Sequence, residues 1–381
     1  MSDTKLRVVQ IIDRLHIGGA ERILVMLSNI LHQHGHEVKV ITTVSDGPLV
    51  NQLHTEIQHV SLGRKWKWNI VTMRKLVNEI KDYDVIHVHS SHNLRYVYLA
   101  MKLFRVKKAI FFHEHYGDIH IDPSIRWHQK LVYPKVVFIG VSSKHTQWAI
   151  HKLGMPEEQI FLLPNTVEKW SVDNFRENKN LHNRLLLVSN FRPSKNIEFA
   201  VELFKELRKA DSTYHLTIIG QIADKEYYEK IKTLIAGNEL NENIEIVHNC
   251  SNIQPFLHQF GFALHTAISE SGPLVLIEYM AQGLPFLTYN TGEVVEQIKS
   301  KIPLAVINSF DKNEWHSRIQ ILMSLPFDDL RHKFANVYDH YFSTEVYYKK
   351  LMEIYQTVLN NTERNKINLN KHQIKNSLPG S

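Results

Sequence analysis

The sequence predicts an α/β protein with two doubly wound domains, each a parallel sheet covered by helices on both faces. Short β-branched apolar segments alternate with amphipathic helical segments along most of the 381 residues. Most apolar segments are continuous rather than alternating, which is typical of strands buried on both faces of a parallel sheet. A polar stretch at 171–183 interrupts the series once. The length allows about two domains with separate cores.

The elements of the first domain follow in chain order. Runs of Val, Ile, Leu and Phe predict strands at 6–12, 37–43, 85–89, 109–113, 136–141 and 160–163. Apolar residues at helical spacing predict helices at 20–34 and 70–81 between them. Residues 1–168 are therefore assigned to an N-terminal domain.

The second series repeats this alternation. It predicts strands at 184–189, 215–220, 244–248, 262–265, 285–289 and 304–306, with helices at 197–210 and 225–236. Residues 180–343 are therefore assigned to a C-terminal domain. A last helix is predicted at 344–362, and the Asn- and Lys-rich residues 363–381 are predicted to be disordered.

The composition restricts the class of protein. With 43% hydrophobic and 22% charged residues, the chain is globular rather than disordered. The single cysteine, Cys250, excludes a disulfide framework and a thiolate-rich metal site, and it indicates a reducing compartment. No apolar run reaches the roughly 18 residues that span a bilayer, and the N-terminus lacks the pattern of a signal peptide. We therefore expect a cytoplasmic protein.

The basic excess lies in the first half of the chain. Residues 1–165 hold 21 Lys and Arg against 14 Asp and Glu, whereas the remainder holds 24 against 25. The asymmetry indicates an anionic partner for the first half. A difference of a few charges also arises by chance, which is the alternative explanation.

The loop after the first predicted strand contains paired glycines. Gly18 and Gly19 open a helix, where glycine lets the backbone approach an anion and the helix start supplies N–H donors. The G-x-G-x-x-G spacing of dinucleotide-binding folds is absent, which disfavours NAD. A tight turn without a ligand would explain the pair equally well.

A second informative loop follows the strand predicted at 262–265. Glu270 precedes a predicted helix that has Pro273 in its first turn and Glu278 in its second. Because one carboxylate comes before the helix and the other lies on it, the pair can hold sugar hydroxyls while the helix start holds phosphate.

These loops resemble the retaining glycosyltransferases of family 4. The shared features are Gly-Gly-Ala-Glu-Arg at 18–22, Pro-Asn-Thr-Val at 164–167, Ser-Asn-Phe-Arg-Pro-Ser-Lys-Asn at 189–196, the acids Glu270 and Glu278, and Ala-Gln-Gly-Leu-Pro at 281–285. They occur in the order of the family and span about residues 5–360. The resemblance implies the GT-B fold, in which two Rossmann-like domains face each other across a cleft and the last helix packs back on the first domain. It also implies that the first domain mostly binds the acceptor and that the second binds a nucleotide-activated sugar.

The resemblance also implies roles for individual residues. Glu278 would bind the ribose of a nucleotide-sugar donor, and Glu270 would bind hydroxyls of the transferred sugar. Lys195 and Arg192 would neutralise the departing diphosphate. Asn190 stands where many relatives have a basic residue, so either Arg192 supplies that charge or Lys195 acts alone. The remaining donor-binding positions are the loop residues Gly18, Gly19, Ser271, Gly272, Pro273 and Leu274.

A retaining mechanism would let the acceptor attack from the face that the diphosphate leaves, with a diphosphate oxygen taking the acceptor's proton. Glu270 then binds the sugar and is not a covalent nucleophile. A double displacement, which needs a carboxylate beside the anomeric carbon, stays open as an alternative. A UDP- or GDP-sugar is the expected donor, with no metal required.

Histidines end two neighbouring strands of the first domain. The resemblance places a histidine beside the reacting sugar at His113, which shares one side of an extended segment with His115. His87 and His89 form a similar pair. A zinc site from these histidines stays an alternative, but no metal is expected because GT-B enzymes normally need none.

Two segments combine basic with apolar residues, namely Arg-Lys-Trp-Lys-Trp at 64–68 and the run at 99–108. Tryptophan beside lysine suits a lipid headgroup layer, so we predict reversible docking on the inner face of an anionic membrane. A solvated helix face with two packing tryptophans is the alternative. Nucleic-acid binding is disfavoured because neither segment forms a recognised motif.

The predicted function is transfer of a sugar from a nucleotide donor to a cell-envelope polysaccharide, lipopolysaccharide or lipid-linked acceptor. Rivals are a GT-B epimerase, a phosphorylase, which would need a pyridoxal-binding lysine, and a catalytically silent GT-B scaffold. The joint presence of Lys195, Glu270 and Glu278 argues against the scaffold.

Overall fold

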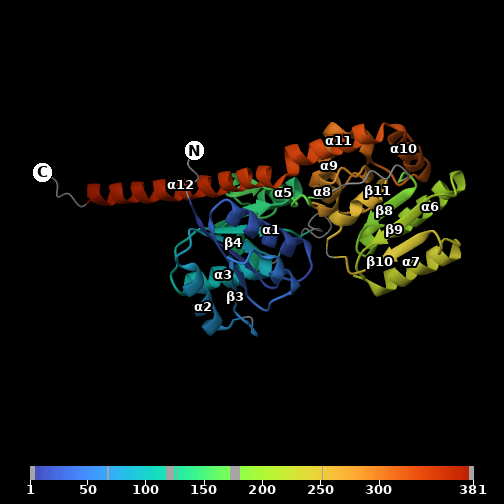
Figure 1. The fold of residues 1–381 in the computed structure, drawn as a ribbon. Coiled ribbons are helices and arrows are strands. Elements are labelled where there is room, and N and C mark those ends of the chain that lie inside the picture. The colour runs from blue at the N-terminus through green and yellow to red at the C-terminus, as the bar shows by residue number, and fades with distance from the viewer. Residues whose placement is uncertain are drawn as a thin grey trace. The chain divides into compact units, whose positions relative to one another are not determined.

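The structure is a computed structural model that describes residues 5–66, 68–116, 124–125, 127–171, 181–250 and 252–376. Its packing divides the chain into two compact units (Figure 1). The first unit extends to Leu163 and takes up the chain again from Tyr347, and the second is Pro164–Val346. The first unit therefore ends five residues before the predicted boundary at 168, and it resumes three residues after the predicted start of the last helix at 344.

The first unit contains a seven-stranded parallel sheet in the order β3-β2-β1-β4-β5-β6-β7. Its strands are β1 (Arg7–Ile12), β2 (Glu37–Thr42), β3 (Gln58–Ser61), β4 (Val85–His89), β5 (Ile110–Glu114), β6 (Val137–Gly140) and β7 (Ile160–Leu162). Six of them lie within a residue or so of the predicted strands. The sequence does not predict β3, because this short edge strand is half-buried and mostly polar.

Helices cover both faces of this sheet. They are α1 (Gly19–Gln33), α2 (Ile70–Ile80), α3 (Ser91–Leu103), α4 (Trp127–Val132) and α5 (Ser143–His151). On one face α1 and α12 (Thr344–Asn376) pack through Leu27, Leu351 and Tyr355, and on the other α2, α3 and α5 form a separate core. The side chain of Asn69 accepts hydrogen bonds from the N–H groups at the start of α2 and so sets where it begins.

The second unit contains a six-stranded parallel sheet in the order β10-β9-β8-β11-β12-β13. Its strands are β8 (Arg184–Val188), β9 (His215–Ile219), β10 (Ile244–Val247), β11 (Phe262–His265), β12 (Phe286–Tyr289) and β13 (Val306–Ile307). Its helices are α6 (Ile197–Ala210), α7 (Lys225–Gly237), α8 (Leu274–Ala281), α9 (Glu293–Lys301), α10 (Lys312–Ser324) and α11 (Phe327–Val337). A single hydrophobic core joins the sheet to these helices.

The strand order reverses once in each sheet, between β1 and β4 and between β8 and β11. Connections leave in opposite directions at such a point, so the loops there separate and leave room for a ligand at the carboxyl edge. The two reversal points are therefore the places to examine for function.

The last helix is longer than predicted. α12 continues to Asn376, whereas the sequence analysis ends it at 362. The polar residues 363–376 contain neither Pro nor Gly, so nothing in them interrupts the hydrogen bonding of the helix. Among the helices in the described ranges, none is long and apolar enough to cross a lipid bilayer.

Candidate active site

Three neighbouring strands of the second unit end at one edge of its sheet. β8, β11 and β12 lie side by side, and the loops after them carry Lys195, Glu270 and Thr291. The carboxyl ends of parallel strands share an edge, so the topology explains why residues far apart in sequence meet here. The structure thus brings together Lys195 and Glu270, to both of which the sequence analysis gave a role in binding the donor.

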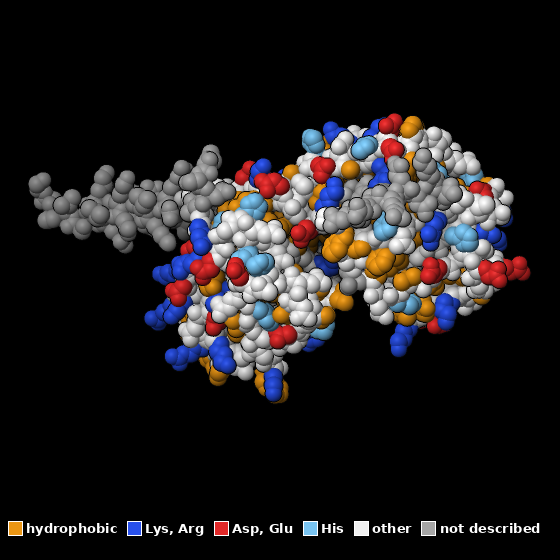
Figure 2. All heavy atoms as spheres, viewed as in Figure 1, with side chains coloured by type: hydrophobic (Ala, Val, Ile, Leu, Met, Phe, Trp, Pro, Cys, Tyr) orange, Lys and Arg blue, Asp and Glu red, His pale blue; other side chains and the backbone are white. Residues whose placement is uncertain are grey.

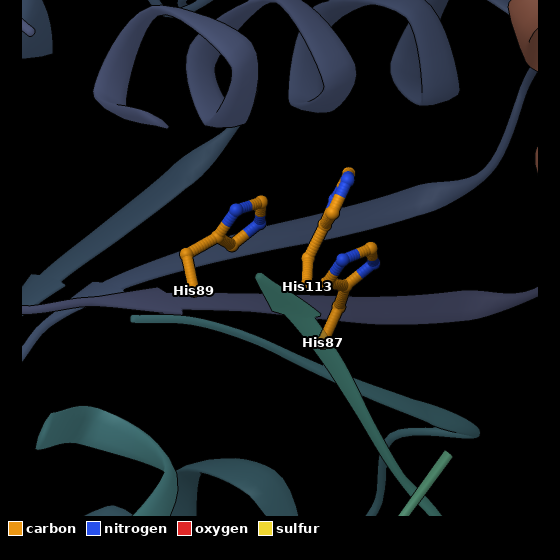
Figure 3. Close-up of side chains that lie close together, drawn as sticks. All are labelled: His87, His89 and His113. Carbon is orange, nitrogen blue, oxygen red and sulfur yellow. The ribbon is translucent and has the colours of Figure 1, made fainter. Parts of the chain in front are cut away.

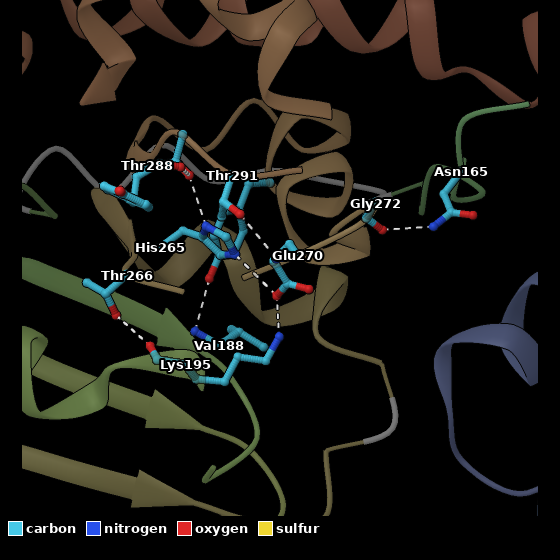
Figure 4. Close-up of polar contacts among 11 residues, drawn as sticks. Asn165, Val188, Lys195, His265, Thr266, Glu270, Gly272, Thr288 and Thr291 are labelled. Carbon is cyan, nitrogen blue, oxygen red and sulfur yellow. Dashed lines mark hydrogen bonds and ion pairs between the residues drawn. The ribbon is translucent and has the colours of Figure 1, made fainter. Parts of the chain in front are cut away.

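Lys195, His265 and Glu270 form a compact polar group, which we call the Lys195 cluster (Figure 4). The Lys195 ammonium donates a hydrogen bond to Oε1 of Glu270 and forms an ion pair with it. Nε2 of His265 lies 3.6 Å from the same oxygen, and its Nδ1 lies 2.9 Å from Oγ1 of Thr288. The side chains of Lys195 and Glu270 are 11% and 14% exposed, so a ligand can still reach both.

The contacts set the charge state of the Lys195 cluster. Burial alone would raise the pKa of Glu270, but Lys195 and His265 lower it to about 2. Burial lowers the pKa of His265 in spite of the adjacent carboxylate, so its ring is neutral at neutral pH. The cluster offers a carboxylate that can accept hydrogen bonds from hydroxyls and an ammonium that can bind phosphate.

Backbone contacts fix the position of Lys195. The turn Pro193–Lys195 ends at Asn196, whose φ of 50° lies in the left-handed region that asparagine tolerates better than most residues. The hydroxyl of Thr266 donates a hydrogen bond to the carbonyl of Lys195 at 3.0 Å. Lys195 is thereby tied to the end of β11, the same strand that leads to Glu270.

The loop after β12 fixes the position of Glu270. Oγ1 of Thr291 accepts a hydrogen bond from the N–H of Glu270 at 3.1 Å. Gly292 has a φ of 86°, and a β-carbon on it would lie 2.9 Å from Cδ of Pro273 and 3.2 Å from Cβ of Glu270. Glycine satisfies both the left-handed backbone and the close approach.

The helix after Glu270 begins one residue later than the sequence predicts. Pro273 is the extended N-cap residue of α8 and Leu274 is its first residue, whereas the sequence places Pro273 in the first turn with Ser271 and Gly272 as its cap. The first N–H groups of any helix have no acceptor within it, so the start of α8 can bind an anion.

The carbonyls of the loop before α8 are used to hold the loop in place. The Ser271 carbonyl accepts a hydrogen bond from the N–H of Glu293 at 2.8 Å. The Gly272 carbonyl accepts one from the side-chain amide of Asn165 at 2.8 Å (Figure 4). Because the carbonyls are engaged in this way, the loop keeps its shape without a ligand.

Glu278 lies in the second turn of α8, as predicted, but it is buried, with 2% of its surface exposed. Its neighbour Tyr279 accepts a hydrogen bond from the N–H of Val188 at 3.0 Å, which ties α8 to the end of β8. Glu278 is therefore less exposed than Glu270, whose side chain is 14% exposed.

Arg192 and Lys195 differ in their surroundings. Arg192 is half-buried, and its Nε is buried without a hydrogen-bond partner among the described residues. Asn190, at the position where many relatives carry a basic residue, uses its side-chain oxygen to accept a hydrogen bond from the N–H of Gln221 at 3.1 Å. Of the two predicted cations, only Lys195 is seen to contact Glu270 in the part of the chain that the structure describes.

The first unit places three histidines side by side at the carboxyl edge of its sheet (Figure 3). His89 on β4 is paired in register with His113 on β5, and His87 lies two residues earlier on the same face as His89. One ring nitrogen from each of His87, His89 and His113 lies within 4.8 Å of the other two, and all three residues are buried. We call these residues the histidine cluster.

The members of the histidine cluster differ in hydrogen bonding. Nδ1 of His87 lies 2.6 Å from the hydroxyl of Tyr355, and His89 contacts His115 and Gln10 at 3.0 and 2.9 Å. Both nitrogens of His113, and Nε2 of His87, find no hydrogen-bond partner among the described residues. Buried polar atoms usually have partners, so these nitrogens have hydrogen-bonding capacity left for a ligand.

All three rings are neutral at neutral pH. Burial, followed by the neighbouring imidazoles, lowers the pKa of His87 to about 3 and brings those of His89 and His113 well below the usual value. Neutral imidazoles can hydrogen bond to sugar hydroxyls or ligate zinc. The donor set therefore fits either ligand, and the predicted sugar contact of His113 and the zinc alternative both stay predictions.

Glu114, the residue after His113, has an unusual pKa. Glu114 is buried, and the burial raises its pKa to about 7, although it accepts hydrogen bonds from the N–H groups of His115 and Tyr116 at 3.0 and 3.1 Å. Tyr133 donates to its other oxygen at 3.3 Å. The end of β5 thus holds a carboxyl that changes charge near neutral pH.

The paired glycines occupy the expected helix start. Gly18 is the extended cap of α1 and Gly19 its first residue. A β-carbon on Gly18 would meet the Glu21 carboxylate, whereas one on Gly19 would meet nothing within 4 Å. Space beside Gly19 is therefore open, which is compatible with the predicted ligand contact but does not require one.

The sequence analysis does not identify His265, Thr291 or Gly292. The sequence signal that could have identified His265 is its position as the last residue of the strand predicted at 262–265. The signal for Thr291 and Gly292 is a Thr-Gly pair that closely follows the strand predicted at 285–289 and precedes a helical segment.

Comparison with known proteins identifies the family. The model of "Glycosyltransferase Family 4" matches residues 17–169, and that of "Glycosyl transferases group 1" matches residues 168–337. The two matches adjoin and together cover most of the chain. This chain belongs to glycosyltransferase family 4. The predicted family and enzyme class are confirmed, and the epimerase and silent-scaffold alternatives are disfavoured.

Individual relatives of this glycosyltransferase are distant. The amylovoran biosynthesis glycosyltransferase AmsD of Erwinia amylovora is 24% identical over 286 residues, covering 72% of this chain and 77% of AmsD. A crystal structure of a glycosyltransferase from Rickettsia africae has a TM-score of 0.75 and 21% identity, covering 94% and 99% of the two chains. Anabaena HepE, solved in complex with UDP and glucose, has a TM-score of 0.73 and 14% identity, covering 91% and 98%. These likenesses and the two parallel sheets confirm the predicted GT-B fold.

Proposed function

We propose that this glycosyltransferase is a retaining enzyme that transfers a sugar from a nucleotide-sugar donor, a UDP- or GDP-sugar, to a cell-envelope polysaccharide, lipopolysaccharide or lipid-linked acceptor. The Lys195 cluster carries the proposal, because one group offers a carboxylate for hydroxyls and an ammonium for phosphate. The complex of HepE with UDP and glucose supports a donor of this class, and the likeness to AmsD, a glycosyltransferase of amylovoran biosynthesis, supports a glycan acceptor.

In the proposed reaction the bond between the anomeric carbon and the diphosphate oxygen breaks while the acceptor oxygen bonds to the same carbon from the same face. The acceptor's proton moves to the departing diphosphate oxygen. Lys195, Arg192 and the start of α8 (Pro273 and Leu274) stabilise the negative charge that grows on the diphosphate. These fixed charges take the place of a metal ion, so no metal is required.

Glu270 binds hydroxyls of the transferred sugar in this proposal. Its low pKa keeps it ionised, so it accepts hydrogen bonds and does not donate a proton. Glu278 binds the ribose hydroxyls, and loop residues Ser271 and Gly272 lie beside the phosphates. His113 in the first unit, whose ring nitrogens have capacity left, contacts the sugar or the acceptor.

Thermal-shift measurements with UDP-, GDP-, ADP- and dTDP-sugars test the donor. A ligand that binds only the folded state raises the melting temperature by mass action, so one donor class should do so and the others should not. The coupling constant of the anomeric proton in the product distinguishes retention from inversion. An inverted product, or no shift with any nucleotide sugar, would contradict the proposal.

We further propose that the enzyme acts in the cytoplasm and docks reversibly on the inner face of the membrane. The basic balance of residues 1–165 and the exposed tryptophans at 66 and 68 support docking. Flotation with vesicles of phosphatidylcholine and phosphatidylglycerol at moderate salt tests it, and absence of binding would remove this part of the proposal.

A further inference from the structure

A large cavity opens beside the carboxyl edge of the first sheet. Its volume is about 1020 Å³, at the upper end of the range for small-molecule sites. Asp13 after β1, Val44 after β2 and the loop after β3 form part of its wall. The rest comes from α3, from α4 and from Lys135 in the turn after α4. Asp13 accepts a hydrogen bond from Asn93 at 3.4 Å, which ties this wall to the start of α3.

Exposed aromatic and aliphatic side chains line the cavity. Trp66 and Trp127 are each 75% exposed, Trp68 is 53%, Leu131 is 56% and Leu99 is 38%. Neither Trp66 nor Trp68 is a core residue, so they do not fit the alternative of packing tryptophans. A group of large apolar side chains this exposed around one cavity is typical of a binding site for an apolar ligand.

The same cavity is cationic. Five basic side chains line it against one carboxylate, that of Asp13; they are Arg64, Lys65, Arg95, Lys102 and Lys135. Arg64 lies over the ring of Tyr96 at 4.4 Å, and Lys135 lies 5.9 Å from the ring of Tyr98. Within the described ranges, no ion pair neutralises Lys65 or Lys102. The excess positive charge is therefore available to an anion.

Three nitrogen-bearing side chains and one leucine share one face of α3. His92, Arg95, Leu99 and Lys102 follow one another at spacings of three or four residues and all line the cavity. Lys and Arg side chains are also dense in Figure 2 over the side of the first unit where Figure 1 places α2 and α3. The helix face thus presents charge and apolar surface to the same ligand.

We propose that this cavity binds the acceptor, and that the acceptor carries a phosphate or diphosphate group joined to a long apolar chain. The cations hold the phosphate, and Trp66, Trp127 and Leu131 hold the chain. A free sugar carries no charge for the cations to neutralise and no long chain for the apolar wall. This inference rests on the proposed glycosyltransferase function and adds to it the chemical class of the acceptor's anchor.

Binding of farnesyl diphosphate, a water-soluble molecule with both parts, tests the inference. Inorganic diphosphate carries the charge alone and farnesol the chain alone. Calorimetry should give a dissociation constant for farnesyl diphosphate at least about tenfold below that of either fragment. Quenching of tryptophan fluorescence on binding would report occupation of the cavity. Equal affinity for farnesyl diphosphate and inorganic diphosphate would overturn the role of the apolar wall.

Two double variants and matched controls locate the site. Trp66→Ala with Trp127→Ala, and Lys65→Glu with Lys102→Glu, should each weaken farnesyl diphosphate binding about tenfold or more. All four side chains are exposed, so their replacement leaves the core intact.

Trp170→Ala and Lys225→Glu serve as controls, because they change exposed residues of the same types in the second unit and should have no effect. Unchanged binding in both double variants would overturn the inference. So would binding to phosphatidylglycerol vesicles without binding to farnesyl diphosphate, because that result would make the cavity part of a general membrane-docking surface.

The donor thermal shift and farnesyl diphosphate binding, both measured on the unsubstituted protein, separate the two proposals. If the donor shift persists while farnesyl diphosphate does not bind, the acceptor inference fails and the proposed function stands. If no nucleotide sugar shifts the protein while farnesyl diphosphate still binds, the proposed function fails instead.

Discussion

Lys195 and Glu270, 75 positions apart in the chain, form an ion pair at the edge of the second sheet, with His265 at 3.6 Å from the same carboxylate oxygen. Each partner comes from the loop after a different strand, and β8 and β11 are neighbours at the point where strand order reverses. The ion pair holds the ammonium where the proposed leaving group would arrive, before any donor binds.

Replacing Lys195 should remove transition-state stabilisation. Lys195→Met leaves the Glu270 carboxylate without its main counter-charge, so the pKa of Glu270 should rise from about 2. We expect kcat to fall by a factor of about 10² to 10³, as for loss of one electrostatic contact in an active site. Lys209→Met, at an exposed ion pair on α6, should leave kcat unchanged. Equal activity of the two variants would contradict the role of Lys195.

Glu278 should determine donor affinity. Glu278→Gln keeps the shape of the side chain but removes the charge that would accept hydrogen bonds from ribose hydroxyls. The donor-induced rise in melting temperature should shrink, and KM for the donor should increase by a factor of about ten, which corresponds to one or two hydrogen bonds. Glu296→Gln, on the exposed side of α9, is the matched control. An unchanged donor shift in Glu278→Gln would revive the silent-scaffold alternative.

Gly292 should be needed for the site rather than for the fold alone. Gly292→Ala places a β-carbon 2.9 Å from Pro273, while Gly35→Ala has a similar φ of 82° but meets nothing within 4 Å. Gly35→Ala should lose about 1 kcal/mol of unfolding free energy through its positive φ, whereas the ψ of 158° at Gly292 adds to the backbone cost of Gly292→Ala. Only Gly292→Ala should lose more than this and also weaken the donor thermal shift. Equal effects in denaturant titrations would show that the contact with the Glu270 loop is unimportant.

Stability should fall when the pH falls from 7.5 to 5.5. The buried residues His87, His89 and His113 and the half-buried His115 have folded pKa values far below 6.5, because loss of solvation disfavours their charged forms. The unfolded chain takes up protons on them below pH 6.5 and the folded chain does not. Each should cost about 1.4 kcal/mol over this range.

Glu114 acts in the opposite direction over the same range. Its folded pKa is about 7 and its unfolded value about 4.5, so the folded chain binds the extra proton, and stability rises as the pH falls. The net loss from these five groups should therefore be about 4 kcal/mol. Urea unfolding at the two pH values measures it. Glu114→Gln should enlarge the loss, and His332→Gln, at an exposed position, should not change it.

Removal of metal should leave activity intact. Dialysis against EDTA, followed by assay with the preferred nucleotide sugar, should give the same kcat as the untreated enzyme. Elemental analysis should find no stoichiometric zinc. Zinc bound one to one, and lost in His113→Gln, would instead favour the zinc alternative for the histidine cluster.

Much of the fold could be predicted from the sequence because buried parallel strands are continuous apolar runs. The strand at 262–265 and the helix at 197–210 have the predicted ends. β3 was not predicted because this edge strand has no apolar pattern; three of its four residues are Gln58, His59 and Ser61. The extension of α12 was missed because polar composition suggested disorder, while the absence of Pro and Gly allows a helix to continue.

The site could be predicted only in part. Lys195 and Glu270 were found through motifs, but their ion pair is a product of tertiary structure. His265 is one of 24 histidines, and composition alone gives no reason to select it. The cavity lined by Trp66 and Trp127 joins segments separated by two strands and two helices, so no local pattern could indicate it.

The path of the chain between the two units has a practical consequence. The first unit takes its last helix from residues after Tyr347, and Leu351 and Tyr355 fill the core beneath α1. A fragment that stops at Leu163 would present that apolar surface to water and should aggregate. Excising the second unit while keeping a soluble first unit would require a short linker from Leu163 to Tyr347, not a single truncation.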